Sequence, residues 1–225
     1  MLRLRFGTRA IFLSRMASQT TPRPRARTPA VVPKTRSVHA LREAALSCRA
    51  CPLWKRGTQT VFGEGRAHAR IMAVGEQPGD REDRAGRPFV GPAGRLLDRA
   101  LEAAGIDRDR LYVTNAVKHF KWVARGKRRL HEKPAALELA ACRPWLVAEV
   151  EAVQPQVILC LGATAARSVL GRTVRVLAER GQRLETEFAI PALVTVHPSA
   201  LLRIRDREQA ELAFNDLVAD LRKLR

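Results

Sequence analysis

The four cysteines of the chain are spaced so that they can share one site. Cys48 and Cys51 form a C-x-x-C pair, whereas Cys142 and Cys160 are much further apart. Four thiolates suit tetrahedral zinc or a 4Fe-4S cluster, and zinc ribbons usually supply two C-x-x-C pairs, so the spacing favours the 4Fe-4S cluster. Two exposed cysteines and two small core residues remain the alternative, and a redox pair is disfavoured because Cys48 does not follow a strand.

A loop rich in glycine and proline follows the short apolar run at 71–74. It reads GEQPGDRED and then GRPFVGPAG, which lets the backbone approach a flat ligand closely. Phe89, between two such turns, is either a core aromatic or a stacking platform. The carboxylates of Glu76 and Asp80 either cap a helix or supply a general base. No Walker or G-x-G-x-x-G pattern is present, so no nucleotide cofactor is predicted.

The chain is strongly basic, with 41 Lys and Arg against 22 Asp and Glu and a net charge of +19. Residues 1–42 carry ten of the basic residues and no acid, and the remainder is basic as well. A second basic stretch, the long polar segment 115–134, includes the run KRRLH. Release of counterions from phosphates would drive binding of such a chain to nucleic acid, which is therefore the expected partner.

Apolar runs alternate with helical patterns along the chain. We expect strands at 71–74, 111–114, 157–161 and 192–196, and helices at 94–104, 135–153, 163–170 and 207–222. This alternation predicts an α/β fold, a three-layer α/β/α domain with a central parallel four-stranded sheet, in which the polar loops after the strands meet at one edge.

The first residues differ from the rest in composition. Residues 1–37 are rich in Arg, Pro and Thr, and we expect a disordered basic tail, followed by one domain over residues 38–225. The acid-free start also has the composition of a mitochondrial transit peptide, and Met16 is an alternative start. No apolar stretch reaches the roughly 18 residues of a membrane helix, which excludes a membrane-spanning protein. Four cysteines do not form a disulfide scaffold and no secretory signal is visible, so we expect a cytoplasmic protein, and we assume a monomer.

Taken together, these motifs resemble the uracil-DNA glycosylases of the iron-sulfur (family 4-like) branch. The matching features are the C-x-x-C pair, the Gly-Glu-x-Pro-Gly loop, the PFVGPAG segment, the Thr-Asn strand end and His-Pro-Ser. Gln77 and the inserted KRRLH point to the X-type subclass (UdgX), whose loop reads KRRIH; Leu130 is a conservative departure. The resemblance covers the chain from about Val38 to its C-terminus, and it implies a uracil-DNA glycosylase-like fold with a 4Fe-4S cluster on the four cysteines.

The resemblance also assigns roles in binding the base. Phe89 would stack on uracil, and the amide of Asn115 would pair with its O4 and N3–H, which cytosine presents in reverse. His197 would donate to the departing base near O2. The backbone of Gln77 would complete the pocket. Asp80 and Arg129 would also contact the substrate side, Arg129 by closing its loop and touching phosphate.

The X-type subclass implies one further step. His131 would attack C1′ of the sugar and remain attached to the DNA, with Glu76 orienting it or stabilising the sugar cation. The expected substrate is uracil in DNA, preferably single-stranded, because extrusion of the base costs least there. Two alternatives stay open: an ordinary turnover glycosylase in which KRRLH only grips phosphate, and a non-catalytic protein that binds uracil-containing single strands.

Overall fold

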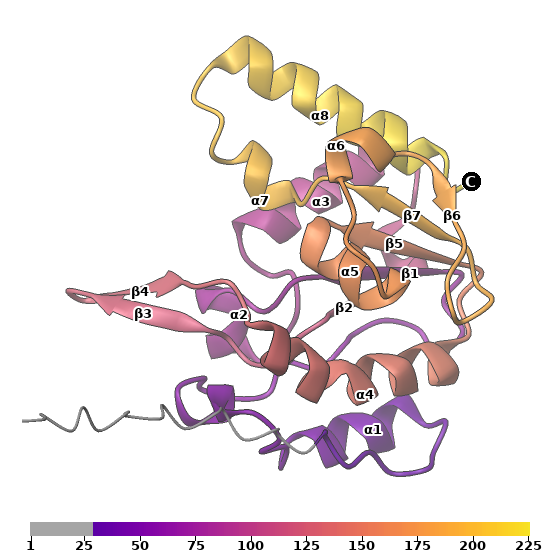
Figure 1. The fold of residues 1–225 in the computed structure, drawn as a ribbon. Coiled ribbons are helices and arrows are strands. Elements are labelled where there is room, and N and C mark those ends of the chain that lie inside the picture. Colours follow the sequence, from indigo (N-terminus) through magenta and orange to yellow (C-terminus); the bar gives the residue numbers. More distant parts are fainter. Residues whose placement is uncertain (1–28) are drawn as a thin grey trace, which may run out of the picture.

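The computed structural model describes residues 29–225, and its centre is one five-stranded sheet (Figure 1). The predicted parallel strands are confirmed, and they lie in the order β2-β1-β5-β7. The fifth strand, β6, pairs antiparallel with β7 at the edge and spans only two residues, too few to leave a pattern in the sequence. The strands are β1 (Ile71–Gly75), β2 (Leu111–Asn115), β5 (Val157–Leu161), β6 (Arg183–Leu184) and β7 (Ala192–Thr195).

The four parallel strands are mostly apolar, with polar residues only near their carboxyl ends, because helices cover both faces of the sheet. Every residue of β1, β2, β5 and β7 is buried. One face packs against α3 (Pro92–Ala103), α7 (Pro198–Leu201) and α8 (Arg207–Arg222). The opposite face packs against α4 (Ala136–Val153) and α5 (Ala163–Leu170). The helices therefore hold the carboxyl ends of the strands at one edge, where the predicted loops meet.

A third hydrophobic cluster lies outside the α/β/α sandwich that the sequence predicts. Helix α1 (Val38–Ala45) packs on the side of α4 that faces away from the sheet, and Figure 1 shows it below α4. The shorter elements are η1 (Pro52–Lys55), α2 (Asp80–Ala85), η2 (Arg108–Arg110) and α6 (Val176–Glu179). Helix α4 is thus buried on two sides, which explains its apolar composition.

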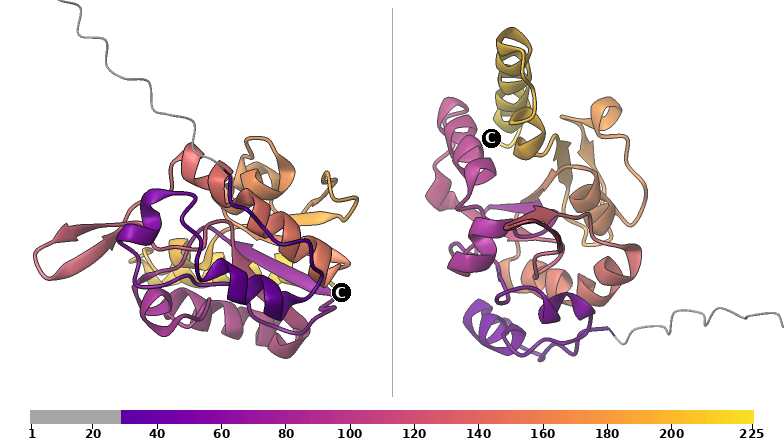
Figure 2. Two further views of the ribbon diagram at one scale, coloured as in Figure 1. Left: turned by 90° about the horizontal axis from the view of Figure 1, so that it is seen from below. Right: turned by 90° about the vertical axis from the view of Figure 1, so that its left-hand side faces the viewer.

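The segment 115–134 is not the irregular loop that the sequence predicts. It contains an antiparallel hairpin of β3 (Trp122–Arg125) and β4 (Arg128–His131), which projects from the domain in Figures 1 and 2. Trp122 pairs with His131, so the two side chains share one face of the hairpin. The hairpin was missed because its two strands have only four residues each and are mostly exposed, so no buried face gives the sequence a period of two.

Part of the expected tail lies against the domain. Ala30 is buried and its N–H donates to the carbonyl of Ala141 in α4 at 3.1 Å. The contact forms because Ala30 and Val32 can bury apolar surface on the outer layer. The expectations for residues 1–28, including the transit peptide and the start at Met16, lie outside the described residues. In residues 29–225, no helix is long and apolar enough to cross a membrane.

Candidate active site

Gly75, the last residue of β1, brings an aromatic ring and an amide together. A Cβ at this position would overlap the Asn115 Oδ1 atom and lie 2.7 Å from Cζ of Phe89. Gly75 and Asn115 are paired in register at the ends of β1 and β2. Because glycine has no side chain, Phe89 and Asn115 can border one small space at the carboxyl edge of the sheet.

The Phe89 ring is held by a strained backbone. Phe89 is a non-glycine residue in the left-handed region, with φ of 57°, and it is 8% exposed. A side chain on Gly94 would overlap the Phe89 carbonyl, so the first turn of α3 presses directly on this backbone. Such strain is typical of sites at which the surrounding structure fixes a functional side chain.

Asn115 keeps its amide available while its backbone is tied down. No described residue forms a hydrogen bond with the side-chain amide, whereas the Asn115 carbonyl accepts from Nζ of Lys118 at 2.7 Å. Lys118 is 1% exposed and forms an ion pair of 2.5 Å with Glu149, which is fully buried. This pair fixes the chain after β2 and leaves the Asn115 amide free to bind a ligand.

The imidazole of His197 has a defined hydrogen-bonding direction. Its Nδ1 atom accepts from the backbone N–H of Ser199 at 3.1 Å, and Ser199 Oγ lies 2.8 Å away. Burial, together with smaller contributions from His131 and Arg203, lowers the pKa of His197 to about 4, so the ring is neutral at pH 7. Since Nδ1 accepts, the proton must sit on Nε2, which is therefore a donor. The ring stacks near Phe89, with centroids 6.3 Å apart.

His131 faces Glu76 across the same edge. Nε2 of His131 lies 3.4 Å from Oε1 of Glu76, and the His131 side chain is 42% exposed. The other oxygen of Glu76 accepts from Thr164 Oγ1 in the first turn of α5. Burial lowers the pKa of His131, opposed by Glu76 and reinforced by Arg203. At neutral pH His131 is therefore an accessible, uncharged imidazole beside a fixed carboxylate.

The side chain of Gln77 ties both ends of the hairpin together. Its Nε2 donates to the carbonyls of Lys121 and Glu132 at 3.1 Å each, and its Oε1 accepts from the Lys121 N–H at 3.1 Å. Lys121 precedes β3 and Glu132 follows β4. The sequence pointed to the backbone of Gln77 as part of the pocket; the structure adds this side-chain role, which fixes where His131 stands.

Arg129 and Asp80 bind each other. Arg129 Nε lies 2.5 Å from Oδ1 of Asp80, and its Nη1 lies 2.7 Å from Oδ2 of the buried Asp83. Burial opposes ionisation of Asp80, but hydrogen bonds from Arg129 and Arg84 lower its pKa overall. These ion pairs tie the hairpin to α2, and the loop-closing role expected for Arg129 stays a prediction. Contact of Asp80 or Arg129 with substrate stays a prediction.

Three of the four cysteines lie together in the layer between α1 and α4. Cys51 and Cys142 are buried there, with Cys48 packed against the same cluster. Trp145 Nε1 donates to Cys48 Sγ at 3.2 Å, and the backbone N–H of Lys118 donates to Cys142 Sγ at 3.3 Å. Burial raises the pKa of the Cys142 thiol to about 12, partly opposed by Lys118. N–H donors aimed at sulfur are the environment that favours thiolate ligands.

Cys160 is not brought together with the other three. It lies in β5 and packs in the layer between the sheet and the inner face of α4, while Cys142 is on the outer face of that helix. Sequence spacing could not reveal this separation, because the alternation of side chains along β5 decides which layer Cys160 enters. Within residues 29–225, no three His, Cys, Asp or Glu side chains stand close enough to hold a metal ion.

One buried imidazole that the sequence analysis did not single out lies beside the three cysteines. His119 is 5% exposed, and its Nε2 is 3.1 Å from Thr60 Oγ1. Thr60 donates to the Ala45 carbonyl, which also accepts from the Cys48 N–H. His119 also directly follows Lys118, the residue whose N–H reaches Cys142. Its position after an apolar strand, next to a buried lysine, left no pattern in the sequence that could have identified it.

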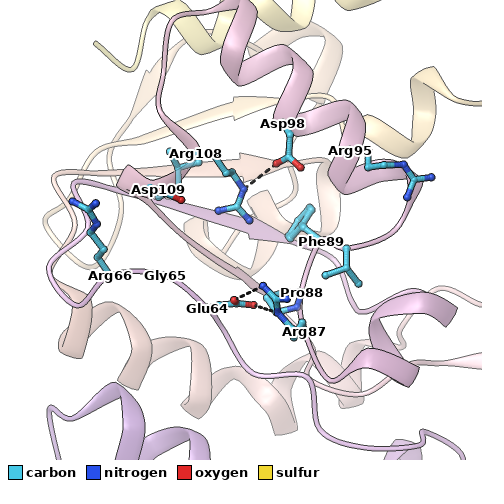
Figure 3. A pocket seen from close by; sticks show the side chains of 12 residues that line it. Glu64, Gly65, Arg66, Arg87, Pro88, Phe89, Arg95, Asp98, Arg108 and Asp109 are labelled. Atoms are coloured by element: carbon cyan, nitrogen blue, oxygen red, sulfur yellow. Dashed lines mark hydrogen bonds and ion pairs between the residues drawn. The ribbon is translucent and has the colours of Figure 1, made fainter.

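A separate hollow of about 510 Å³ lies among residues that include Arg87, Phe89 and Arg108 (Figure 3). It shares Phe89 with the site but none of Asn115, His131 or His197. Two of its arginines are engaged in ion pairs, Arg87 with Glu64 and Arg108 with Asp98. This hollow is thus distinct from the space between Phe89 and Asn115.

Comparison with known proteins decides the family. The family model described as the uracil DNA glycosylase superfamily matches residues 62–222. The chain belongs to the uracil-DNA glycosylase superfamily. It is 39% identical to the type-4 uracil-DNA glycosylase of Thermotoga maritima over 176 residues, which are 78% of this chain and 88% of that protein. It is 35% identical to the type-4 uracil-DNA glycosylase of Pyrobaculum aerophilum over 184 residues, 77% and 90% of the two chains.

A third relative, the type-4 uracil-DNA glycosylase of Sulfurisphaera tokodaii, is 34% identical over 174 residues, covering 74% of this chain and 76% of its own. Membership of the superfamily agrees with the α/β fold and with the residues gathered at the carboxyl edge of the sheet. The similarity therefore extends over the domain that carries the site and not over a single motif.

Proposed function

We propose that this uracil-DNA glycosylase superfamily member excises uracil from DNA and then captures the resulting sugar on His131. The observation that carries the proposal is the placement of a neutral, accessible His131 beside Glu76, at the edge where Phe89, Asn115 and His197 meet. The similarity to type-4 uracil-DNA glycosylases supports the excision step. The subclass features Gln77 and KRRLH motivate the capture step.

Recognition of the base would use three groups of the pocket. The Phe89 ring offers a face on which the flat uracil stacks. The unpaired amide of Asn115 can accept from N3–H and donate to O4, whereas cytosine presents a donor where uracil has an acceptor. The close packing around Gly75 limits the space for anything larger than the base. A uracil rotated out of the DNA stack would be bound on both its face and its edge.

Cleavage of the glycosidic bond would leave its electron pair on uracil N1. The negative charge spreads to O2, where the Nε2–H of His197 can donate a hydrogen bond. The sugar then carries the positive charge, which the carboxylate of Glu76 stabilises. Because Thr164 holds the other oxygen of Glu76, this carboxylate is preorganised and does not have to move as the charge develops.

Capture would form a bond between Nε2 of His131 and C1′. The lone pair on Nε2 attacks the sugar cation while the proton of the neutral ring sits on Nδ1, and the product imidazolium can release that proton to solvent. Arg203 disfavours protonation of His131 before attack. Gln77 and Arg129 would act as positioning residues, because they hold the hairpin that carries His131.

The competing candidate is an ordinary turnover glycosylase of the type-4 kind, in which water takes the place of His131. A labelled single strand with one uracil, boiled in detergent after incubation with the protein, separates the two candidates. An upshifted band on a denaturing gel, absent with thymine, supports capture, while strand scission after alkali without an upshift supports turnover. Absence of both would leave only the binding protein that does not cut.

The nucleophile is tested by His131→Ser, with Leu130→Ser on the opposite face of the same strand as the matched control. We expect H131S to lose the adduct and to release some free uracil through attack by water. L130S should retain the adduct, since its side chain points away from Glu76. A stable adduct in H131S would refute the assignment.

We further propose that Cys48, Cys51 and Cys142 hold an iron-sulfur cluster, and that His119 supplies the remaining ligand in place of Cys160. The three thiols share one layer, and two of them already accept N–H donors. His119 is linked to Cys48 through Thr60 and Ala45. When bound, the cluster would tie η1 to α4; a structural role fits its position outside the pocket.

Iron content tests this ligand set without reference to activity. Cys142→Ala and His119→Ala should lower the bound iron and the visible absorbance of the purified protein. Cys160→Ala should keep both, because Cys160 lies in a different layer. Loss of iron in C160A with retention in H119A would restore the four-cysteine set, and zinc in a colourless protein would refute the cluster.

A further inference from the structure

Two tryptophans beside the hairpin carry basic side chains on their rings. The guanidinium of Arg49 lies 4.2 Å and the ammonium of Lys55 5.8 Å from the ring centroid of Trp54. The guanidinium of Arg56 lies 4.7 Å from that of Trp122. We call these residues the tryptophan surface: Arg49, Trp54, Lys55, Arg56 and Trp122.

The three cations of the tryptophan surface have no carboxylate partner among the described residues. The segment 44–58 contains no Asp or Glu at all. The cations are exposed, and the two indoles are half-exposed. Elsewhere on the surface, arginines such as Arg87 and Arg172 are neutralised by glutamates. The positive charge here is therefore available to an external anion.

The tryptophan surface is continuous with the proposed active site. Trp122 Nε1 donates to the Arg56 carbonyl at 2.9 Å, which joins η1 to the hairpin. Trp122 is also the cross-strand partner of His131. A DNA strand whose abasic sugar is bound at His131 would thus contact Trp122 first and then the segment that carries Trp54.

Resting on the proposed function, we infer that the tryptophan surface binds the single-stranded DNA that leads away from the extruded uracil. Unpaired bases stack on indole rings without regard to sequence, and adjacent cations bind the phosphates between them. Duplex DNA cannot use such a surface, because its base faces are already stacked on one another. The surface therefore favours single strands over duplexes.

The test measures binding of a labelled oligothymidine, which contains no uracil and requires no excision. Trp54→Ala should raise the dissociation constant at least about five-fold, as expected for one lost base stack, and Trp54→Phe should restore part of the affinity. Arg49→Gln should also weaken binding and reduce its dependence on salt. Arg99→Gln is the matched control, because Arg99 is in α3 and lies 5.3 Å from the ring of Phe214 in α8, outside the hairpin and the segment 44–58.

Equal binding of oligothymidine by W54A and the unchanged protein would overturn the inference. So would equal losses in R49Q and R99Q, which would show that net charge alone drives binding. A W54A defect that is as large on duplex DNA as on the single strand would also overturn it. Failure of the proposed function has a different signature, since the unchanged protein would then bind oligothymidine but neither release uracil nor form an adduct.

Discussion

Nε2 of His131 and Oε1 of Glu76 lie 3.4 Å apart, although one residue is at the end of a projecting hairpin and the other follows a central strand. The hairpin thus delivers its imidazole to a carboxylate that is anchored on the sheet and on α5. Glu76→Gln keeps the shape and removes the charge. We expect uracil release to slow by about ten- to a hundred-fold, because stabilisation of the sugar cation is lost. Single-turnover release of uracil measures this, and an unchanged rate would exclude an electrostatic role.

Gly75→Ala tests the contact between Phe89 and Asn115. A methyl group here would overlap the Asn115 amide and lie 2.7 Å from the Phe89 ring, so the two groups must separate. Excision should fall by about a hundred-fold, the effect expected of a misplacement of roughly 1 Å. The melting temperature of this variant should fall by less than it does when a large buried side chain is removed from the core. The control is Gly126→Asn at the hairpin turn, where a Cβ would meet no atom within 4 Å and asparagine tolerates the left-handed backbone with φ of 59°.

Gln77→Ala tests the connection between the two ends of the hairpin. The variant loses three hydrogen bonds, two to backbone carbonyls and one from a backbone N–H. The two ends of the hairpin are then no longer tied together and become more mobile. Adduct formation should decrease more than uracil release, since only capture requires His131 at a fixed place. Amide hydrogen exchange in 121–132 should accelerate in the same variant. Equal losses of both activities would place Gln77 in base recognition instead.

The pH dependence of capture follows from the lowered pKa of His131. Capture requires the neutral ring, and burial moves its pKa below the usual value of about 6.5. The rate of adduct formation should be level from pH 7 upward and should fall as the pH drops through the folded-state pKa. His197 should not contribute above pH 5, because its pKa is about 4. Rapid-quench gels over this range give the profile, and a rise toward acid would contradict a neutral nucleophile.

The buried pair of Lys118 and Glu149 makes a prediction about stability. Lys118→Met should destabilise the protein by about 3–5 kcal/mol, because Glu149 is left buried without its cation. Adding Glu149→Gln should recover part of the loss, since the uncompensated charge disappears. Urea denaturation of both single variants and the double variant measures the coupling. Purely additive losses would show that the two charges do not depend on each other.

The sequence predicted the framework of the fold well because burial leaves a strong pattern. The apolar runs of the four parallel strands and the helix at 207–222 needed no tertiary information. The motifs also pointed to the edge of the sheet at which the structure places Phe89, Asn115, His131 and His197. Their individual roles in binding and catalysis are proposals that rest on the geometry.

The parts that the sequence did not predict depend on contacts between distant residues. The hairpin is held by Gln77 and Arg129, and neither contact leaves a trace in local periodicity. The position of Cys160 follows from which face of β5 it occupies. The pairing of Lys118 with Glu149 joins residues in different elements, and a lone buried lysine cannot be read from composition.

The side chain of Gln77 binds both ends of the hairpin, whereas the turn between its strands projects away from the domain. The length of the hairpin is therefore independent of its anchorage. A Cβ at Gly126 in the turn would meet no atom within 4 Å, while His131 lies at the end of the hairpin that Gln77 binds. Residues inserted at this turn should lengthen the hairpin without moving the imidazole. The tip is accordingly a suitable attachment point for a fluorophore or an affinity handle in experiments that test the proposed capture of uracil-containing DNA.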